Sequence, residues 1–123
     1  MLSVYSFFAS LKRGLRSFRS VVSVPVSSYS YQILLLLYRE GYIQGFSLNK
    51  GKYDVWLKYK GQMSMFANIR MVSKPGRRVY MNRNDLVAKY GMGSAVVVSG
   101  PQGLFIYRRG SIVPSGGEVL VEF

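Results

Sequence analysis

Residues 72–80 read Val-Ser-Lys-Pro-Gly-Arg-Arg-Val-Tyr, and the Lys74-Pro75-Gly76 segment within them is typical of a sharp turn. The residues that precede the turn, 63–72, are predicted to be extended. The residues that follow, 77–81, are predicted to return as a strand. The middle of the chain is therefore predicted to be two extended segments joined by a bend, with basic side chains on both sides of it.

The sequence after this stretch predicts a β-rich half that contains one short helix. Asn82 or Asn84 can cap a helix that runs to about Tyr90 and is closed by Gly91. Beyond it the pattern is all β. Strands are predicted at 95–99, 104–107 and 119–123, with a tight loop at 100–103.

The sequence before the turn predicts alternating helices and strands. Ser27 and Ser28 are candidate N-caps for a helix at 29–40, which Gly41 ends. Its inward side chains are predicted to be Ile33, Leu34, Leu36 and Leu37. Strands are predicted at 21–26, 42–48 and 53–60, with a hairpin turn at 49–52 between the last two. The predicted fold class is α+β with two small lobes: an N-terminal α-β-α-β-β lobe, residues 1–64, packed on a C-terminal β-rich lobe, residues 65–123, with one short helix.

The charge of the chain points to a polyanionic partner. Seventeen Lys and Arg residues stand against five acids in 123 residues, a net charge of +12, yet 49% of the residues are hydrophobic. A disordered basic tail is poor in apolar residues, so this chain is predicted to fold. A small folded domain with this charge repels itself unless an anion compensates. Nucleic acid is the first candidate partner, and an anionic membrane surface is the second.

The residue types that are missing exclude several classes of chemistry. The chain contains neither cysteine nor histidine, so disulfides, thiolate nucleophiles and zinc–sulfur sites are impossible, and the usual general base is lacking. The spacing of the five acids suggests no catalytic pair. The longest apolar run, Ile33 to Tyr38, is far shorter than a bilayer helix requires. We therefore expect no enzyme, catalytic residue, metal site, cofactor, small-molecule substrate or membrane span.

The first twenty residues allow two interpretations. They contain four basic residues, five serines and no acid, which is typical of a mitochondrial transit peptide. They also carry apolar residues at helical spacing: Val4, Phe7, Phe8, Leu11, Leu15 and Phe18. We prefer an ordinary basic amphipathic helix, because a cleaved leader would not normally remain on a mature protein.

Three clusters of basic residues are candidate nucleic-acid contacts. Lys12, Arg13, Arg16 and Arg19 lie on the predicted first helix; Lys74, Arg77 and Arg78 surround the central turn, with Tyr80 beyond; and Arg108 and Arg109 follow the glycine-rich loop 99–103. Arginine and lysine neutralise phosphates, and loop glycines let backbone N–H groups approach a sugar–phosphate chain. Tyrosine offers a face for base stacking. On charge alone, each cluster can equally be a solvated surface.

Four stretches together resemble protein eight of the small ribosomal subunit, a family that binds the central domain of small-subunit ribosomal RNA. They are Val24-Pro25-Val26-Ser27, residues 40–46 (Glu-Gly-Tyr-Ile-Gln-Gly-Phe), residues 72–80, and Gly116-Gly117-Glu118-Val119-Leu120. Their order and spacing agree with the family from about residue 7 to the C-terminus. No single stretch is decisive, but the ordered set is specific.

The resemblance implies a set of RNA-binding residues, mainly in the C-terminal lobe. They are Lys12, Arg13, Arg16, Ser27, Ser28, Lys74, Arg77, Arg78, Tyr80, Ser99, Gly100, Pro101, Gly103, Arg108, Gly116, Gly117 and Glu118. Two departures stand out. The family's Ser-Thr-Ser-Lys-Gly loop is Ser-Gly-Pro-Gln-Gly at 99–103, which loses two hydroxyls, and the family's lysines after the Pro-x-Ser motif are Ser28 and Ser30.

The resemblance implies a structural component of the small ribosomal subunit that supports folding and assembly of ribosomal RNA, with neighbouring small-subunit proteins as further partners. The departures and the acid-poor composition suggest a divergent organellar member in the mitochondrial matrix, with another organellar or a bacterial ribosome as the alternative. Met1 suits translation inside the organelle. The alternative function is a cationic peripheral membrane protein anchored by its first helix.

Overall fold

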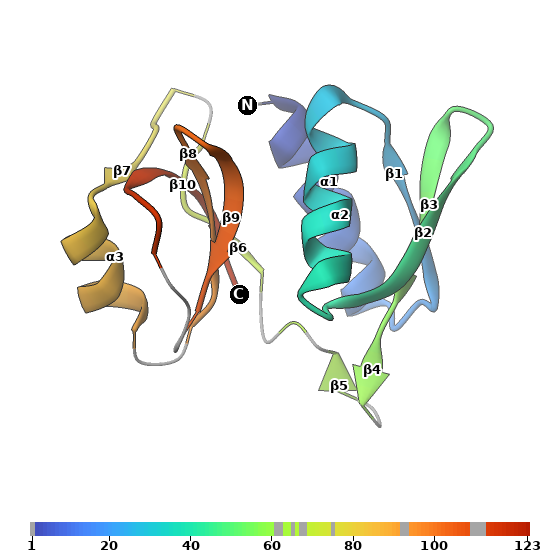
Figure 1. The fold of residues 1–123 in the computed structure, drawn as a ribbon. Helices are drawn as coiled ribbons and strands as arrows, with labels where there is room; N and C mark the ends of the chain where they lie inside the picture. Colours follow the sequence, from blue (N-terminus) through green and yellow to red (C-terminus); the bar gives the residue numbers. More distant parts are fainter. Residues whose placement is uncertain are drawn as a thin grey trace. The chain divides into compact units, whose positions relative to one another are not determined.

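The computed structural model describes residues 2–60, 63–64, 66, 69–74, 76–91, 94–108 and 113–123. The chain divides into two compact units, Met1–Ala67 and Asn68–Phe123, and each is described by itself. Both units combine helix with antiparallel sheet (Figure 1). The α+β class predicted from the sequence is confirmed.

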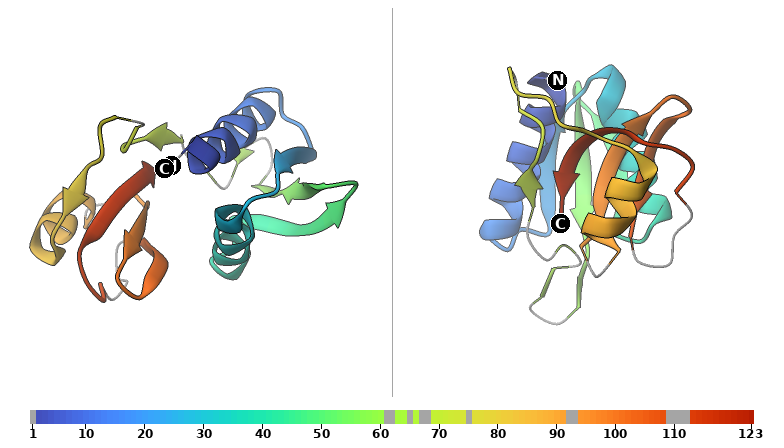
Figure 2. Two further views of the ribbon diagram at one scale, coloured as in Figure 1. Left: turned by 90° about the horizontal axis from the view of Figure 1, so that it is seen from above. Right: turned by 90° about the vertical axis from the view of Figure 1, so that its left-hand side faces the viewer.

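The first unit places two helices on one face of a three-stranded sheet (Figures 1 and 2). Its elements are α1 Leu2–Arg16, β1 Val21–Pro25, α2 Ser28–Arg39, β2 Ile43–Asn49, β3 Lys52–Leu57, β4 Tyr59–Lys60 and β5 Met63–Ser64. The sheet order is β1-β3-β2, and both pairings are antiparallel. β4 and β5 form a separate two-stranded ribbon. The predicted α-β-α-β-β order is thus confirmed, but the strand predicted at 53–60 is divided at Lys58 into β3 and β4, because β4 pairs with β5 instead of the three-stranded sheet.

Local sequence signals set the ends of the elements in the first unit. The Ser27 hydroxyl accepts a hydrogen bond from the Ser30 amide at 3.1 Å, and the Ser30 hydroxyl accepts one from the Ser27 amide at 2.7 Å, which is a reciprocal capping box. Gly41 follows α2 with φ +81°, the left-handed conformation that glycine adopts without strain. Lys50 and Gly51, both at positive φ, make the two-residue turn between β2 and β3.

The apolar stripes of α1 and α2 become the core of the first unit, except at Phe18 and at the half-buried Leu15 and Leu36. Four side chains of α1, Val4, Phe7, Phe8 and Leu11, are at most 2% exposed. Phe18 was predicted to continue the stripe, but α1 ends at Arg16 and the Phe18 ring is 70% exposed. On α2, Leu36 is half-buried rather than fully inward, because the helix turns Ile33, Leu34 and Leu37 toward the core.

The second unit is a sheet with a short helix against one face (Figures 1 and 2). Its elements are β6 Arg70–Met71, β7 Tyr80–Met81, α3 Arg83–Tyr90, β8 Val96–Gly100, β9 Gly103–Tyr107 and β10 Gly117–Glu122. β10 is central: β8 pairs with one edge, and β6 and β7 pair in turn with the other. The Asn82 side chain caps α3 by accepting from the Asp85 amide at 2.8 Å, so Asn82 rather than Asn84 is the cap.

The core of the second unit lies between α3 and the sheet. Leu86 and Tyr90 of α3 pack with Val96 and Val98 of β8 and Val119 of β10, all nearly inaccessible to solvent. Burial raises the pKa of the Tyr90 hydroxyl to about 12, and the nearby Glu122 carboxylate adds to the shift. Glu122 is itself paired with Arg70 at 2.6 Å across β10 and β6.

The two extended segments around the central turn are shorter than predicted. Of the predicted segment 63–72, the described residues form only β5 and β6, while residues 65, 67 and 68 lie outside the described residues. The predicted strand 77–81 is reduced to β7, Tyr80–Met81. The reason is that 76–79 belong to the turn itself: Lys74 and Arg77 form an isolated bridge, so pairing with β10 resumes only at Val79 and Tyr80.

Candidate nucleic-acid interface

Three of the predicted contact residues lie side by side across the sheet of the second unit. Glu118 of β10 is the register partner of Tyr80 on β7 and of Ser99 on β8. These residues are separated by 19 or more positions in the chain, and the sheet alone brings them into one row. We name Tyr80, Glu118 and Ser99 the cross-strand row. It joins an aromatic face, a carboxylate and a hydroxyl, the groups that recognise unpaired bases and ribose hydroxyls.

Tyr80 is the exposed member of the cross-strand row, whereas Ser99 and Glu118 are half-buried. The Tyr80 side chain is 65% exposed, so its ring is available for stacking. One carboxylate oxygen of Glu118, Oε2, is buried and has no hydrogen-bond partner within the described part of the chain. An unsatisfied buried acceptor costs about 1–3 kcal/mol, and more when it is charged.

The glycines at this end of the sheet allow close approach of two backbones. A Cβ at Gly117 would lie 2.9 Å from the Gly100 Cα and closer still to the Ser99 carbonyl oxygen. A Cβ at Gly116 would lie 2.7 Å from the Asn82 Cα. Side chains larger than hydrogen are therefore excluded at both positions. Gly116 and Gly117 set the spacing between β10 and its neighbours, and so position the cross-strand row.

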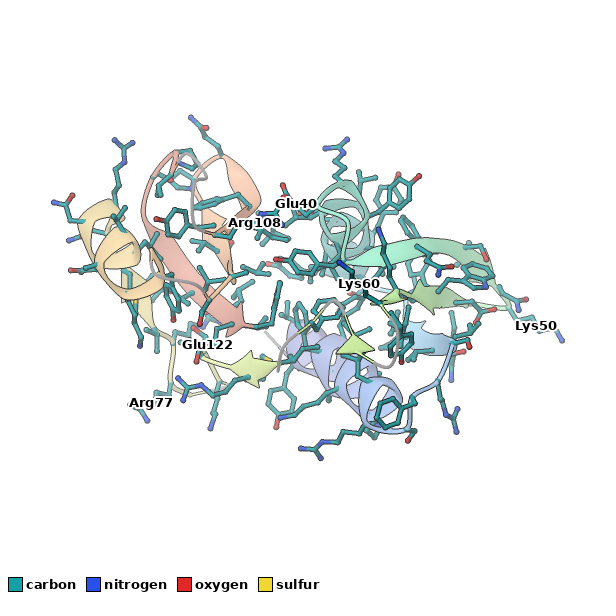
Figure 3. The ribbon with its side chains drawn as sticks, turned by 90° about the horizontal axis from the view of Figure 1, so that it is seen from below. Glu40, Lys50, Lys60, Arg77, Arg108 and Glu122 are labelled. Carbon is teal, nitrogen blue, oxygen red and sulfur yellow. The ribbon has the colours of Figure 1, made fainter. Side chains whose placement is uncertain are left out.

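The basic turn lies directly beside this row along β10. The backbone amides and carbonyls of Lys74 and Arg77 exchange two hydrogen bonds of 2.9 Å, and Gly76 between them has φ +83°. The side chains of Lys74, Arg77 and Arg78 are all exposed. Figure 3 shows the Arg77 side chain pointing away from the ribbon. Because the next register pair is Tyr80 with Glu118, three cationic side chains lie within a few residues of the row.

Ser73 fastens this turn to β10 and was not predicted as a functional residue. Its side chain is fully buried, and its hydroxyl accepts from the Val79 amide at 3.0 Å and donates to the Val119 carbonyl. The Val119 amide in turn donates to the Val79 carbonyl at 2.9 Å. One hydroxyl therefore ties both arms of the turn to the central strand. The sequence carries no signal for this role, because a serine beside a turn is ordinarily exposed.

The glycine-rich loop is the tip of the β8–β9 hairpin. Gly100 pairs with Gly103, Pro101 and Gln102 form the bend, and Gly103 takes φ +116°. Pro101 and Gly103 are exposed, while Gly100 is half-buried against Ser115 and Gly116. The loop therefore extends the cross-strand row at the Ser99 end.

Arg108 is not brought to the same place. It follows Tyr107, which pairs with Val96 at the far end of the β8–β9 hairpin, four ladder positions from the Gly100–Gly103 pair. At roughly 3.3 Å per residue, that separation exceeds the reach of one side chain. A contact by Arg108 would belong to a different part of the RNA from the contact made by the row.

The predicted residues of the first unit form a separate group. Lys12, Arg13 and Arg16 lie on α1, with Arg13 and Arg16 exposed and Lys12 half-buried. Ser28 is exposed at the start of α2. The Ser27 hydroxyl has a structural role, because it is engaged in the capping box.

The fold and the site define a basic, two-unit α+β protein whose second unit carries an exposed tyrosine beside exposed cationic side chains. The sequence model for "Ribosomal protein S8" matches residues 4–123, and the chain belongs to that family. Membership of this structural, non-enzymatic family confirms that the chain is not an enzyme. This finding agrees with the resemblance first given by the four ordered stretches.

Bacterial relatives are similar over most of the chain. The chain is 37% identical over 118 residues to small ribosomal subunit protein uS8 of Caulobacter vibrioides (strain NA1000 / CB15N), covering 91% of this chain and 89% of that protein. It is 36% identical over 115 residues to uS8 of Azoarcus sp. (strain BH72), covering 89% and 87%. It is 35% identical over 114 residues to uS8 of Buchnera aphidicola subsp. Schizaphis graminum (strain Sg), again covering 89% and 87%.

Proposed function

We propose that this chain is a structural protein of the small ribosomal subunit that binds the central domain of the ribosomal RNA through its C-terminal lobe, residues 65–123. The observation that supports this most is the cross-strand row, in which Tyr80, Glu118 and Ser99 lie together beside the basic turn. The turn holds phosphates, and the row recognises the base and ribose edges of a bent or bulged helix. Neighbouring small-subunit proteins are further partners.

Glu118 is the specificity residue in this proposal. A carboxylate near phosphates is costly unless it accepts a hydrogen bond, and its buried Oε2 lacks a donor within the described residues. Glu118 as a whole is half-buried, and a base amine or ribose hydroxyl donates to its carboxylate group. Glu118→Ala should therefore weaken binding to a central-domain fragment more than binding to an unrelated duplex. Asp85→Ala, which removes an exposed acid of the same lobe, is the matched control. Equal losses on both RNAs would remove this role for Glu118.

The basic turn supplies affinity without sequence preference. Replacing Lys74 and Arg77 by Gln removes two charges and leaves the backbone bridge between them intact. Each phosphate contact contributes about 0.7–0.9 to the slope of log affinity against log salt, so this double variant should flatten the slope by about 1.4–1.8. An unchanged slope would show that the turn does not contact phosphate.

We also propose that the ribosome is an organellar one, in the mitochondrial matrix. Support comes from the departures at 99–103 and at Ser28, together with the acid-poor, aromatic-rich composition. The relatives given above are bacterial, so they do not support this part of the proposal. The test is to fractionate cells and probe each fraction with an antibody to the chain. The chain should be found in mitochondrial ribosomes. Recovery only with cytoplasmic ribosomes would contradict this part.

The membrane alternative is less well supported. The apolar stripe of α1 that would enter a lipid surface is buried at Val4, Phe7, Phe8 and Leu11. Within the described part of the chain, no helix has the length and apolar character needed to cross a bilayer. Vesicle binding by residues 1–20, independent of the remaining chain, would revive the alternative.

A further inference from the structure

Phe18 occupies a position that neither the backbone nor the core explains. The Arg19 amide donates to the Gly14 carbonyl at 3.1 Å and the Phe18 amide donates to the Leu15 carbonyl at 3.2 Å, the paired bonds of a Schellman C-cap. Phe18 is the left-handed residue of that cap, with φ +53°, where glycine is preferred. Its ring is 70% exposed. Phe18 therefore combines a strained backbone conformation with a solvent-exposed phenyl ring.

A polar pocket is lined by the two chain neighbours of Phe18, Ser17 and Arg19. It lies between the C-terminal half of α1 and β1, and its volume is about 370 Å³. Two arginines and three serines supply its polar lining: Arg13, Arg19, Ser10, Ser17 and Ser23. The ~30 Å³ that one water occupies is about a tenth of this volume, so a hydrated phosphate group fits without rearrangement. No acid lines the pocket.

The groups around the pocket are held in place. The Arg13 guanidinium donates to the Ser10 hydroxyl at 3.2 Å, which orients it along α1. The Tyr59 hydroxyl donates to the Arg19 carbonyl at 2.7 Å, which fixes the backbone beside Phe18. Burial raises the pKa of Tyr59, so this donor stays protonated at neutral pH. Such preorganisation reduces the entropy that ligand binding must otherwise overcome.

Two kinds of group near the pocket could repel an anion, but both already accept hydrogen bonds within the protein. Asp54 is hydrogen-bonded to Ser23, and its two carboxylate oxygens accept from the Ser23 hydroxyl and the Asn49 side-chain amide, each at 3.0 Å. The last carbonyls of α1 would present partial negative charge. Those of Arg13, Gly14 and Leu15 accept from the amides of residues 17, 19 and 18, which reduces that effect. The two guanidinium groups therefore dominate the field in the pocket.

We propose that Phe18 and this pocket bind one unpaired nucleotide of RNA, with its phosphate between Arg13 and Arg19 and its base stacked on the Phe18 ring. The inference rests on the proposed RNA-binding function and adds a second contact, on the first unit, distinct from the cross-strand row. An aromatic face beside a cationic groove is the arrangement with which proteins hold single-stranded nucleotides. The phenyl ring has no hydrogen-bonding group, so the contact tolerates any base.

The test uses the full chain and a central-domain RNA fragment across a salt series. Phe18→Gly should weaken binding by about 5- to 150-fold, the effect of losing one aromatic–base stack, with little change in salt slope. Phe18→Tyr should bind like the unchanged chain. The Arg13→Gln/Arg19→Gln double variant should flatten the slope by about 1.4–1.8. Glycine relieves the strain at position 18, so unfolding cannot cause the loss.

Controls on the same unit separate this site from a general loss of charge or aromatic surface. Arg39→Gln and Tyr38→Ala alter exposed residues of α2 outside the pocket, and both should leave specific binding unchanged. Wild-type affinity in Phe18→Gly, or an unchanged slope in the double arginine variant, overturns the proposal. Failure of the proposed function is a different result: the unchanged chain would then show no preference for the central-domain fragment over an unrelated duplex.

Discussion

Replacing Ser73 by alanine tests how the basic turn is held against β10. The side chain is fully buried, and its hydroxyl serves the Val79 amide and the Val119 carbonyl together. Alanine leaves both backbone groups without this partner. An unsatisfied buried polar group costs about 1–3 kcal/mol. Val79 is half-buried, so water can partly replace the lost partner of its amide. The cost for the Val79 amide alone is therefore expected in the lower half of the about 1–3 kcal/mol range.

We therefore expect Ser73→Ala to lower the free energy of unfolding by about 2 kcal/mol. In a unit of this size each kcal/mol moves the midpoint by roughly 4–8 °C. Urea and thermal unfolding followed by circular dichroism measure the change. The control is Ser115→Ala, because the half-buried Ser115 hydroxyl donates to the carbonyl of its own chain neighbour, Gly116, at 3.1 Å.

The same variant should also weaken RNA binding, because the turn that carries Lys74 and Arg77 loses its tether. Ordinary surface substitutions change the free energy of unfolding by no more than about 0.5 kcal/mol. A Ser73→Ala protein with a change that small would refute the reasoning. Loss of stability with unchanged RNA affinity would show that the hydroxyl supports the fold without positioning the turn.

Three further predictions concern single positions. Gly117→Ala should lower the free energy of unfolding by about 1–3 kcal/mol in a urea titration, because the new Cβ meets the Ser99 carbonyl. The control is Gly45→Ala, whose Cβ meets nothing within 4 Å, and its free energy of unfolding should stay close to that of the unchanged chain. Phe18→Gly should raise the unfolding free energy by about 1 kcal/mol by removing left-handed strain, and a urea midpoint at or below that of the unchanged chain would contradict this. The Tyr90 pKa is raised from 10.0 to about 12, so the folded state holds this proton more tightly than the unfolded state does. The resulting stabilisation is complete below pH 10 and is lost as the pH rises to about 12. Tyr90→Phe should flatten that alkaline loss in urea midpoints measured over this range, and an identical pH profile would contradict the assignment.

The features that the sequence predicts correctly depend on neighbouring residues. The capping serine at 27, the stop at Gly41 and the turn at Lys50 and Gly51 each follow from the conformational preference of one or two residues. The basic turn at 74–77 is of the same kind. Such signals place the elements along the chain, and they were sufficient for the α+β class.

The features that sequence reasoning missed depend on tertiary context. The cross-strand row depends on the register of β10 against β7 and β8, which no local pattern specifies. The role of Ser73 depends on the burial of its side chain, and a serine in the sequence gives no indication that it will be buried. Phe18 fits the helical spacing of the apolar stripe, and only the early end of α1 removes it from the core.

The central claim is that the cross-strand row and the basic turn of the C-terminal lobe recognise a particular RNA. The most direct test is the affinity of the full chain for a central-domain small-subunit RNA fragment, compared with an unrelated duplex of equal length, across a salt series. We predict a preference of at least about tenfold that persists at ~0.2 M salt, because base and ribose contacts are less sensitive to salt than phosphate contacts. Affinities that fall together and become equal for the two RNAs would contradict the claim, since charge alone would then account for binding.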